Sequence, residues 1–169
     1  MKINTCKLSV FTVGTMMLFG ASAIAGDLPK QGTYNCTYYT HGTYKASAIG
    51  KDISMSSFED NGLVLGTGLY DHMTLHCWGS YENVKGKAKN SGYCVGTDVD
   101  GDQVAGNFSS EYAADAKTNN GTFTIIGGTG KYVGITGSNT YVADTSEFRT
   151  GSDGTYAGFS VFQGSYKLP

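Results

Sequence analysis

The chain has 169 residues, of which 12 are lysine or arginine and 14 are aspartate or glutamate, so its formal net charge is −2. The basic residues are scattered, and a mildly acidic chain without a basic stripe offers little to a phosphate backbone or an anionic membrane surface. We therefore expect no nucleic-acid partner. The length suits one domain with its own hydrophobic core.

The first 25 residues have the composition of a secretory signal peptide. Lys2 and Lys7 give a positive start, residues 8–19 form an apolar run, and Ala23-Ile24-Ala25 offers a small-x-small cleavage site. The run is too short to span a bilayer, and no other segment approaches ~18 apolar residues. We predict a signal peptide at 1–25, a mature domain at 26–169 without membrane insertion, and a periplasmic or secreted location.

Alternation with a period of two runs through the mature chain, and no helical periodicity is sustained. Between residues 69 and 81 the odd positions, such as Leu75 and Cys77, form a largely apolar face. The even positions form a second face that carries His76 and Trp78. Runs of β-branched and aromatic residues continue to the C-terminus and favour pleated strands.

Turn signals separate these runs. The only two prolines, Pro29 and Pro169, lie near the ends of the mature chain, so every N–H between them is free to join a ladder. Glycines inside strand-like runs, such as Gly79 and Gly164, are typical of bends where a sheet curls. Four Asx-Gly dipeptides of the kind that close tight hairpins are Asn61-Gly62, Asp100-Gly101, Asn120-Gly121 and Asp153-Gly154. These patterns predict an all-β, single-domain, antiparallel eight-stranded barrel, with a two-sheet β-sandwich as the alternative.

Three cysteines remain after the predicted cleavage, and an odd count in an oxidising compartment indicates one disulfide and one further thiol. Cys77 and Cys94 lie on runs that read as hairpin partners, where opposed Cβ atoms come within about 4.5–5.5 Å. We predict a Cys77–Cys94 disulfide and a buried thiol at Cys36.

One glycine-rich stretch resembles the Gly-Gly-Thr-Gly-x-aromatic signature of the allene oxide cyclase and dirigent superfamily. The residues that carry it are Gly127, Gly128, Thr129, Gly130, Tyr132, Gly134 and Gly137. Together with Cys94 and the acidic segment 98–102, it also resembles a group of small exported bacterial proteins related to that superfamily. The resemblance implies an eight-stranded barrel around an apolar cavity. The glycines allow a tight turn and then close backbone packing as the next strand begins, so the motif supports the fold. No catalytic residue of the superfamily can be matched to a position in this sequence.

Candidate residues for the cavity come from the aromatic and histidine positions. His72, His76 and Trp78 share one face of a predicted strand and would line the cavity if that face points inward. Tyr34 and Tyr38 combine apolar area with a hydroxyl group and suit either a pocket or a core. His72 and His76 are about 13 Å apart on a strand, too far to bind one metal ion together, so we predict no metal there.

Carboxylates supply two weaker candidates. Asp98, Asp100 and Asp102 have oxygen-rich spacing that could hold calcium, but Gln103 and Ser109 stand where an EF-hand has its glycine and glutamate. An Asp-Gly hairpin with solvated acidic flanks explains the same residues. Acid or base candidates, if buried, are Glu82, Glu111, Asp144 and Glu147.

The leading hypothesis for function is an exported barrel that binds a small hydrophobic or amphipathic ligand without a cofactor. No nucleophile motif and no Cys-x-x-Cys pair is found. One alternative is a cofactor-free cyclase, isomerase or lyase, for which the resemblance implies an allene-oxide-cyclase-like isomerase or cyclase. Another is a structural or interaction protein of the cell envelope. Formation of a homo-oligomer is left open.

Overall fold

The computed structural model describes residues 28–169, so the predicted signal peptide at 1–25 lies outside the described residues. Long strands with short connections make up most of this part of the chain. The strands are β1 (Gln31–Ile49), β2 (Ile53–Thr67), β3 (Thr74–Val84), β4 (Lys87–Thr97), β5 (Gln103–Ala113), β6 (Thr118–Gly128), β7 (Thr136–Asp144), β8 (Arg149–Thr150) and β9 (Thr155–Lys167), with the 3-10 helix η1 (Gly130–Tyr132) between β6 and β7.

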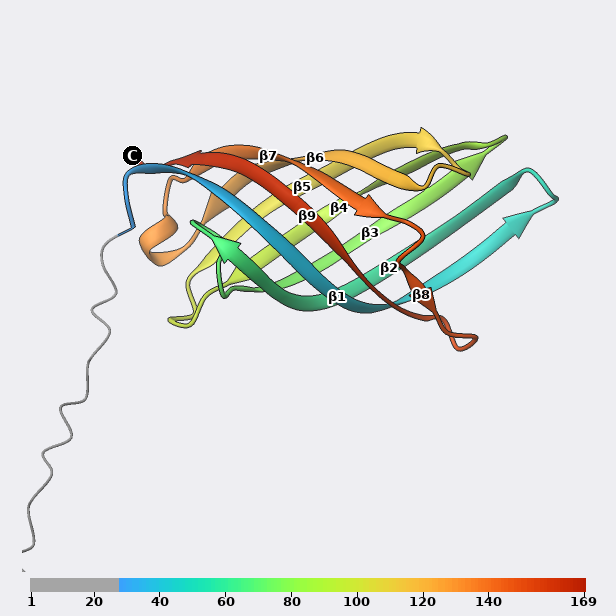
Figure 1. Cartoon of the computed structure of the whole chain (residues 1–169), viewed down its shortest axis with the longest axis horizontal. Coiled ribbons are helices and arrows are strands. Elements are labelled where there is room, and N and C mark those ends of the chain that lie inside the picture. Colours follow the sequence, from blue (N-terminus) through green and yellow to red (C-terminus); the bar gives the residue numbers. More distant parts are fainter. Residues whose placement is uncertain (1–27) are drawn as a thin grey trace, which may run out of the picture.

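The sheet closes on itself. Each strand from β1 to β6 pairs antiparallel with the next, β7 pairs with β9, and β9 pairs with β1. The closing ladder runs from Gln31 opposite Lys167 to Thr43 opposite Thr155. Figure 1 shows the resulting elongated barrel, with the orange turn before β7 at one end and β8 near the other. Eight strands form the wall and β8 adds a short pair to β9, so the predicted barrel is confirmed and the sandwich alternative is wrong.

The two ends of the barrel differ. Loops plug the end where β1 begins and β9 finishes: the β2–β3 connection contributes Leu69, Tyr70 and Met73, and the η1 region contributes Tyr132 and Ile135, each at most 3% exposed. Burying these large side chains supplies much of the apolar stabilisation of the fold. The interior is hollow only beyond this plug.

The glycine-rich stretch and the acidic segment hold this plug together. Thr129 Oγ1 accepts the N–H of Gln103 at 2.8 Å, and the Tyr132 hydroxyl donates to Asp98 Oδ2 at 2.9 Å. Gly130 has a φ of +49° and lies against the Asp102 carboxylate, where a Cβ would collide. The motif therefore has a structural role at the closed end of the barrel.

The Asx-Gly prediction is half right. Asp100-Gly101 and Asp153-Gly154 lie in turns, with φ of +85° at Gly101 and +83° at Gly154. Asn61-Gly62 and Asn120-Gly121 instead lie inside β2 and β6. At Gly121 the reason is close packing, because the ring of Tyr141 occupies the space that a Cβ would take. A glycine that makes room for an aromatic ring and a glycine that turns the chain look alike in sequence.

The cysteine prediction is confirmed. Cys77 and Cys94 are direct register partners on β3 and β4 and form a disulfide, with Cα atoms 4.1 Å apart. Cys36 is a free, buried thiol that donates to the carbonyl of Thr67 at 3.4 Å.

Among residues 28–169, no helix is long and apolar enough to cross a membrane.

Candidate functional site

A cavity of about 440 Å³ occupies the barrel between the plug and the β8 end. Its wall is mainly aromatic and aliphatic, with contributions from every barrel strand and from the β7–β8 connection. The apolar and aromatic lining residues include Tyr38, Tyr44, Phe58, Tyr70, Leu75, Tyr81, Phe108, Phe123, Tyr141, Ala143, Phe148, Tyr156 and Phe162. A volume of this size falls within the range of small-molecule pockets.

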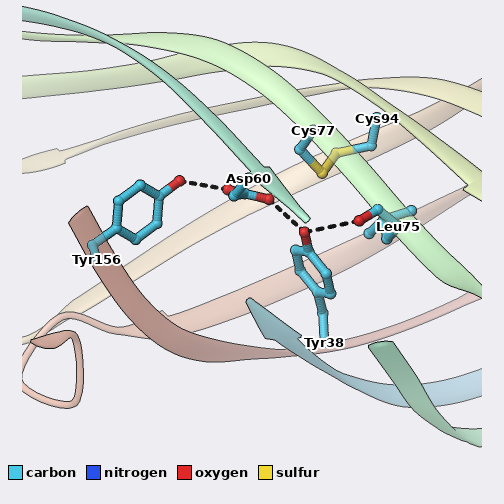
Figure 2. The surroundings of a disulfide bond; sticks show 6 residues. All are labelled: Tyr38, Asp60, Leu75, Cys77, Cys94 and Tyr156. Atoms are coloured by element: carbon cyan, nitrogen blue, oxygen red, sulfur yellow. Dashed lines mark hydrogen bonds between the residues drawn. A yellow bond between two sulfur atoms is a disulfide. The ribbon is translucent and has the colours of Figure 1, made fainter. Parts of the chain in front are cut away.

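One carboxyl group, Asp60 on β2, lies on the wall and is 6% exposed. Figure 2 shows it between two tyrosines: the Tyr38 hydroxyl donates to Oδ1, and the Tyr156 hydroxyl donates to Oδ2 at 2.6 Å. Its register partner on β1 is Gly42, where a Cβ would crowd the Asp60 side chain. The alternation of β2 places Ser56, Phe58, Asp60 and Val64 on the inner face, so a carboxyl group stands beside apolar side chains on the cavity wall.

Burial raises the pKa of Asp60, and the hydrogen bonds from Tyr156 and Tyr38 only partly offset this rise. Burial, and then the neighbouring Asp60, also raise the pKa of both tyrosines, so both remain protonated phenols at neutral pH. Tyr38 has one proton but two acceptors within reach, Asp60 and the carbonyl of Leu75 at 3.2 Å. Burial therefore opposes the ionisation of Asp60, while the two phenols that donate to it favour the carboxylate.

Asparagine at Asp60 should remove a pH dependence of stability. Because burial raises the folded-state pKa above the unfolded value of about 3.9, folding takes up a proton between the two values. The wild-type free energy of unfolding should thus fall as pH rises from about 4 to the folded pKa, by about 1.4 kcal/mol per unit of pKa difference. Asp60→Asn keeps a neutral donor and acceptor, so its stability relative to wild type should increase over the same window.

Urea unfolding of both proteins across that pH range measures the effect. Other carboxylates titrate equally in wild type and variant, so the difference between the two curves isolates Asp60. A difference that stays constant above about pH 4 would contradict the raised pKa.

Some residues of the cavity wall also carry buried polar atoms without partners. Four such side-chain atoms have no hydrogen-bond partner within residues 28–169: Tyr70 Oη, Asn90 Oδ1, Asn119 Oδ1 and Asn139 Oδ1. Each buried unpaired polar group costs about 1–3 kcal/mol. Native proteins rarely leave such groups unpaired, and buried water is the usual partner of such atoms. The lining residues include no lysine, arginine or histidine.

The sequence-predicted cavity residues separate into two groups. Tyr38 lines the cavity, and Tyr34 lies in the adjoining core, where its hydroxyl accepts from Asn139 Nδ2 at 3.3 Å. The placement of His72, His76 and Trp78 in the cavity is wrong. Trp78 and the side chain of His76 are 42% and 44% exposed on the outer face of β3. His72 precedes β3 in a turn, with a φ of +62° and a 73% exposed side chain. The odd positions of β3 point inward, and only barrel closure decides that choice.

The candidate carboxylates also lie elsewhere. Glu82, Glu111 and Glu147 are exposed and Asp144 is half-buried, whereas Asp60, which the sequence analysis missed, is buried.

In the acidic segment, Lys131 Nζ lies 2.7 Å from Asp98 Oδ2 and 2.7 Å from Asp100 Oδ2, so an ammonium group stands where the calcium hypothesis places the ion. The Asp102 carboxylate accepts the N–H of Lys131 at 3.1 Å. Across residues 28–169, no three His, Cys, Asp or Glu side chains converge as metal ligands.

A comparison with solved structures finds a similar fold in a pterocarpan synthase dirigent protein. The match has a TM-score of 0.51 and 12% sequence identity, and covers 83% of this chain and 88% of that chain. The fold is a dirigent-like barrel. No family model matches the sequence, and no curated protein matches it at a significant level. The likeness agrees with the resemblance drawn from the glycine-rich stretch, and at this identity it shows the fold alone.

Proposed function

We propose that this dirigent-like barrel is an exported protein that binds a small amphipathic molecule in its cavity. The observation that carries the proposal is the 440 Å³ hollow, whose mainly aromatic wall includes the hydrogen-bonded cluster of Asp60, Tyr38 and Tyr156. An apolar body would pack against the aromatic wall, and a hydroxyl or similar group would bond with this cluster. A hollow interior argues against the purely structural alternative, for which a filled barrel is expected.

Export is supported by the signal-like residues 1–25 and by the Cys77–Cys94 disulfide, which is typical of oxidising compartments. The bacterial origin is proposed from the sequence resemblance. A mature N-terminus at Gly26, read by mass spectrometry on protein recovered from periplasm or medium, is the expected result. Recovery of the uncleaved chain from the cytoplasm would contradict export.

Binding can be tested with N-phenyl-1-naphthylamine, a neutral apolar fluorophore whose emission rises in a dry pocket. Wild type should bind it saturably. Ala143 on β7 lines the cavity, so Ala143→Phe should fill part of the hollow and weaken binding at least about tenfold, or about 1.4 kcal/mol.

The neighbouring Val142 points outward and is 44% exposed, so Val142→Phe is the matched control and should bind as wild type does. Equal affinity of the two variants would place the fluorophore outside the barrel and remove the main support for the proposal. Urea unfolding of both variants shows whether each remains folded.

A second candidate function is a cofactor-free isomerase, cyclase or lyase, and the specific observation in its favour is Asp60. A neutral carboxyl that faces an apolar cavity and is held by two phenols can donate a proton to a substrate, and its carboxylate can later recover one.

Native mass spectrometry and solvent extraction would first identify a bound compound. Incubating it with the protein in D₂O should then incorporate deuterium at carbon. Asp60→Asn should still bind the compound but stop the incorporation, whereas no incorporation by wild type would leave only the binding function.

A further inference from the structure

Two exposed aromatic rings form a platform on the outer wall of the barrel, on the face opposite the cavity. Trp78 on β3 and Tyr93 on β4 are direct register partners, 42% and 50% exposed. Their ring centroids are 6.4 Å apart and their planes differ by 29°, so the two rings are nearly parallel, and the His76 ring lies 5.3 Å from the Trp78 ring. β3 and β4 lie side by side in the wall (Figure 1). We call Trp78 and Tyr93 the aromatic platform.

The platform is rigid and is not used by the core. The inward-facing neighbours of the two rings are Cys77 and Cys94, and their disulfide joins the strands directly behind the platform. Exposed apolar area of this kind is unfavourable in water unless a partner covers it. Because the disulfide fixes the two strands that carry the rings, their backbone loses little further freedom on binding, which favours affinity.

Hydrogen-bonding side chains surround the rings in register. In the same row, Glu59 lies opposite Trp78 and Asn107 lies opposite Tyr93. The adjacent row across β2 to β5 is made only of serines that are direct partners of one another, namely Ser57, Ser80, Ser91 and Ser109. These serines are short, so they form a hydroxyl shelf beside the taller rings. Glu59 is bonded to His76 Nε2 at 2.8 Å, which occupies its carboxylate.

We propose that the aromatic platform and the central serines of the row, Ser80 and Ser91, bind an uncharged, β-1,4-linked glycan chain that lies across β3 and β4. The face of an aromatic ring carries partial negative charge and attracts the polarised C–H groups on the face of a pyranose. The equatorial hydroxyls at the edge of the sugar both donate and accept, as serine hydroxyls and the Asn107 amide do. A β-1,4 linkage keeps the chain flat, so successive sugars can meet both rings and the neighbouring hydroxyls of Ser80 and Ser91. A lipid or an apolar peptide would leave the serine row unpaired. This site is independent of the cavity.

The position of Trp78 makes the proposal directly measurable, because it is the single tryptophan of the chain. Titration with cellohexaose or with chitohexaose should change its fluorescence saturably. Maltohexaose, whose α-1,4 linkage curves the chain, should bind at least about tenfold more weakly.

Variants of the platform are then compared by co-sedimentation with microcrystalline cellulose. Trp78→Ala and Tyr93→Ala should each weaken binding at least about tenfold, and the double variant Ser80→Ala/Ser91→Ala about threefold. Tyr39→Ala is the matched control, because Tyr39 is 52% exposed on the outer face of β1, beside Phe159 and away from the serine row. It should bind as wild type does. Tyr93→Phe should retain binding, which separates loss of the ring from loss of the fold.

Three outcomes would overturn the proposal. The first is no saturable response to either β-1,4 hexamer. The second is an equal loss of binding in Tyr39→Ala and Tyr93→Ala, which would indicate non-specific adsorption. The third is a dimer in sedimentation velocity that dissociates in Trp78→Ala and does not bind glycan, which would make the platform an interface between copies of this chain. Ala143→Phe should not affect glycan binding, so failure here and failure of the cavity proposal can be told apart.

Discussion

Alanine at Tyr70 should lower the free energy of unfolding by about 3–5 kcal/mol, the usual cost of deleting a large core aromatic side chain. Tyr70 is 2% exposed at the boundary between the plug and the cavity. Its ring makes edge contacts with three other aromatic rings, with centroid distances of 5.1 Å to Tyr34, 6.4 Å to Phe123 and 5.6 Å to Phe162. Loss of the ring would enlarge the cavity and remove these contacts together.

Phenylalanine at the same position is the matched control. The Tyr70 hydroxyl has no partner within the described residues, so its removal should leave stability unchanged or raise it by about 1 kcal/mol. Urea unfolding of the three proteins measures both effects. A stability loss in Tyr70→Phe as large as in Tyr70→Ala would show that the hydroxyl is satisfied in the empty protein. If the hydroxyl contacts the ligand, Tyr70→Phe should also weaken ligand binding while leaving the fold intact.

Removal of the disulfide should have the second large effect. Cys77 and Cys94 are 17 residues apart, and closing a loop of this length contributes about 3 kcal/mol through the entropy of the unfolded chain. The double variant Cys77→Ala/Cys94→Ala should therefore unfold at a lower urea concentration, by that free energy. It should also loosen the aromatic platform on the other side of the strands.

Two measurements control this experiment. Wild type under reducing conditions should lose a similar amount of stability, whereas the double variant should not respond to the reductant. Cys36 is buried and should react with a thiol reagent only after unfolding in both proteins. Equal stability of oxidised and reduced wild type would show that β3 and β4 are held by their ladder alone.

Of the residues on the cavity wall, Tyr38 could be predicted from the sequence and Asp60 could not. Tyr38 was found because tyrosine in a strand is a candidate for any pocket wall. Asp60 was missed, although the part of its row from Phe58 to Val64 is otherwise without a polar side chain. That row was the available signal: one carboxylate on the apolar face of a strand. The signal was masked because Asn61-Gly62 was read as a turn, which divides β2 in two.

The outward orientation of His76 and Trp78 shows a second limit. Alternation separates a strand into two faces, but polarity assigns them to inside and outside only when one face is clearly polar. On β3 one face carries Leu75 and Cys77, and the other carries His76 and Trp78, so either face could have been buried. The same ambiguity affects the asparagines of the cavity wall, since Asn90, Asn119 and Asn139 point inward although asparagine is mostly exposed.

By itself, the sequence determined the all-β class, the Cys77–Cys94 pair and the absence of a sustained helical pattern, because each depends on local periodicity or spacing, whereas the choice of a barrel over a sandwich needed the pairing of β9 with β1. Only the tertiary structure decided which face of each strand looks inward, and with it the Asp60–tyrosine cluster, the unpaired polar wall and the exposed aromatic platform. Those features arise when β9 pairs with β1. Closure brings residues as far apart in sequence as Asp60 and Tyr156 into contact, and it makes one face of the sheet the interior of the barrel.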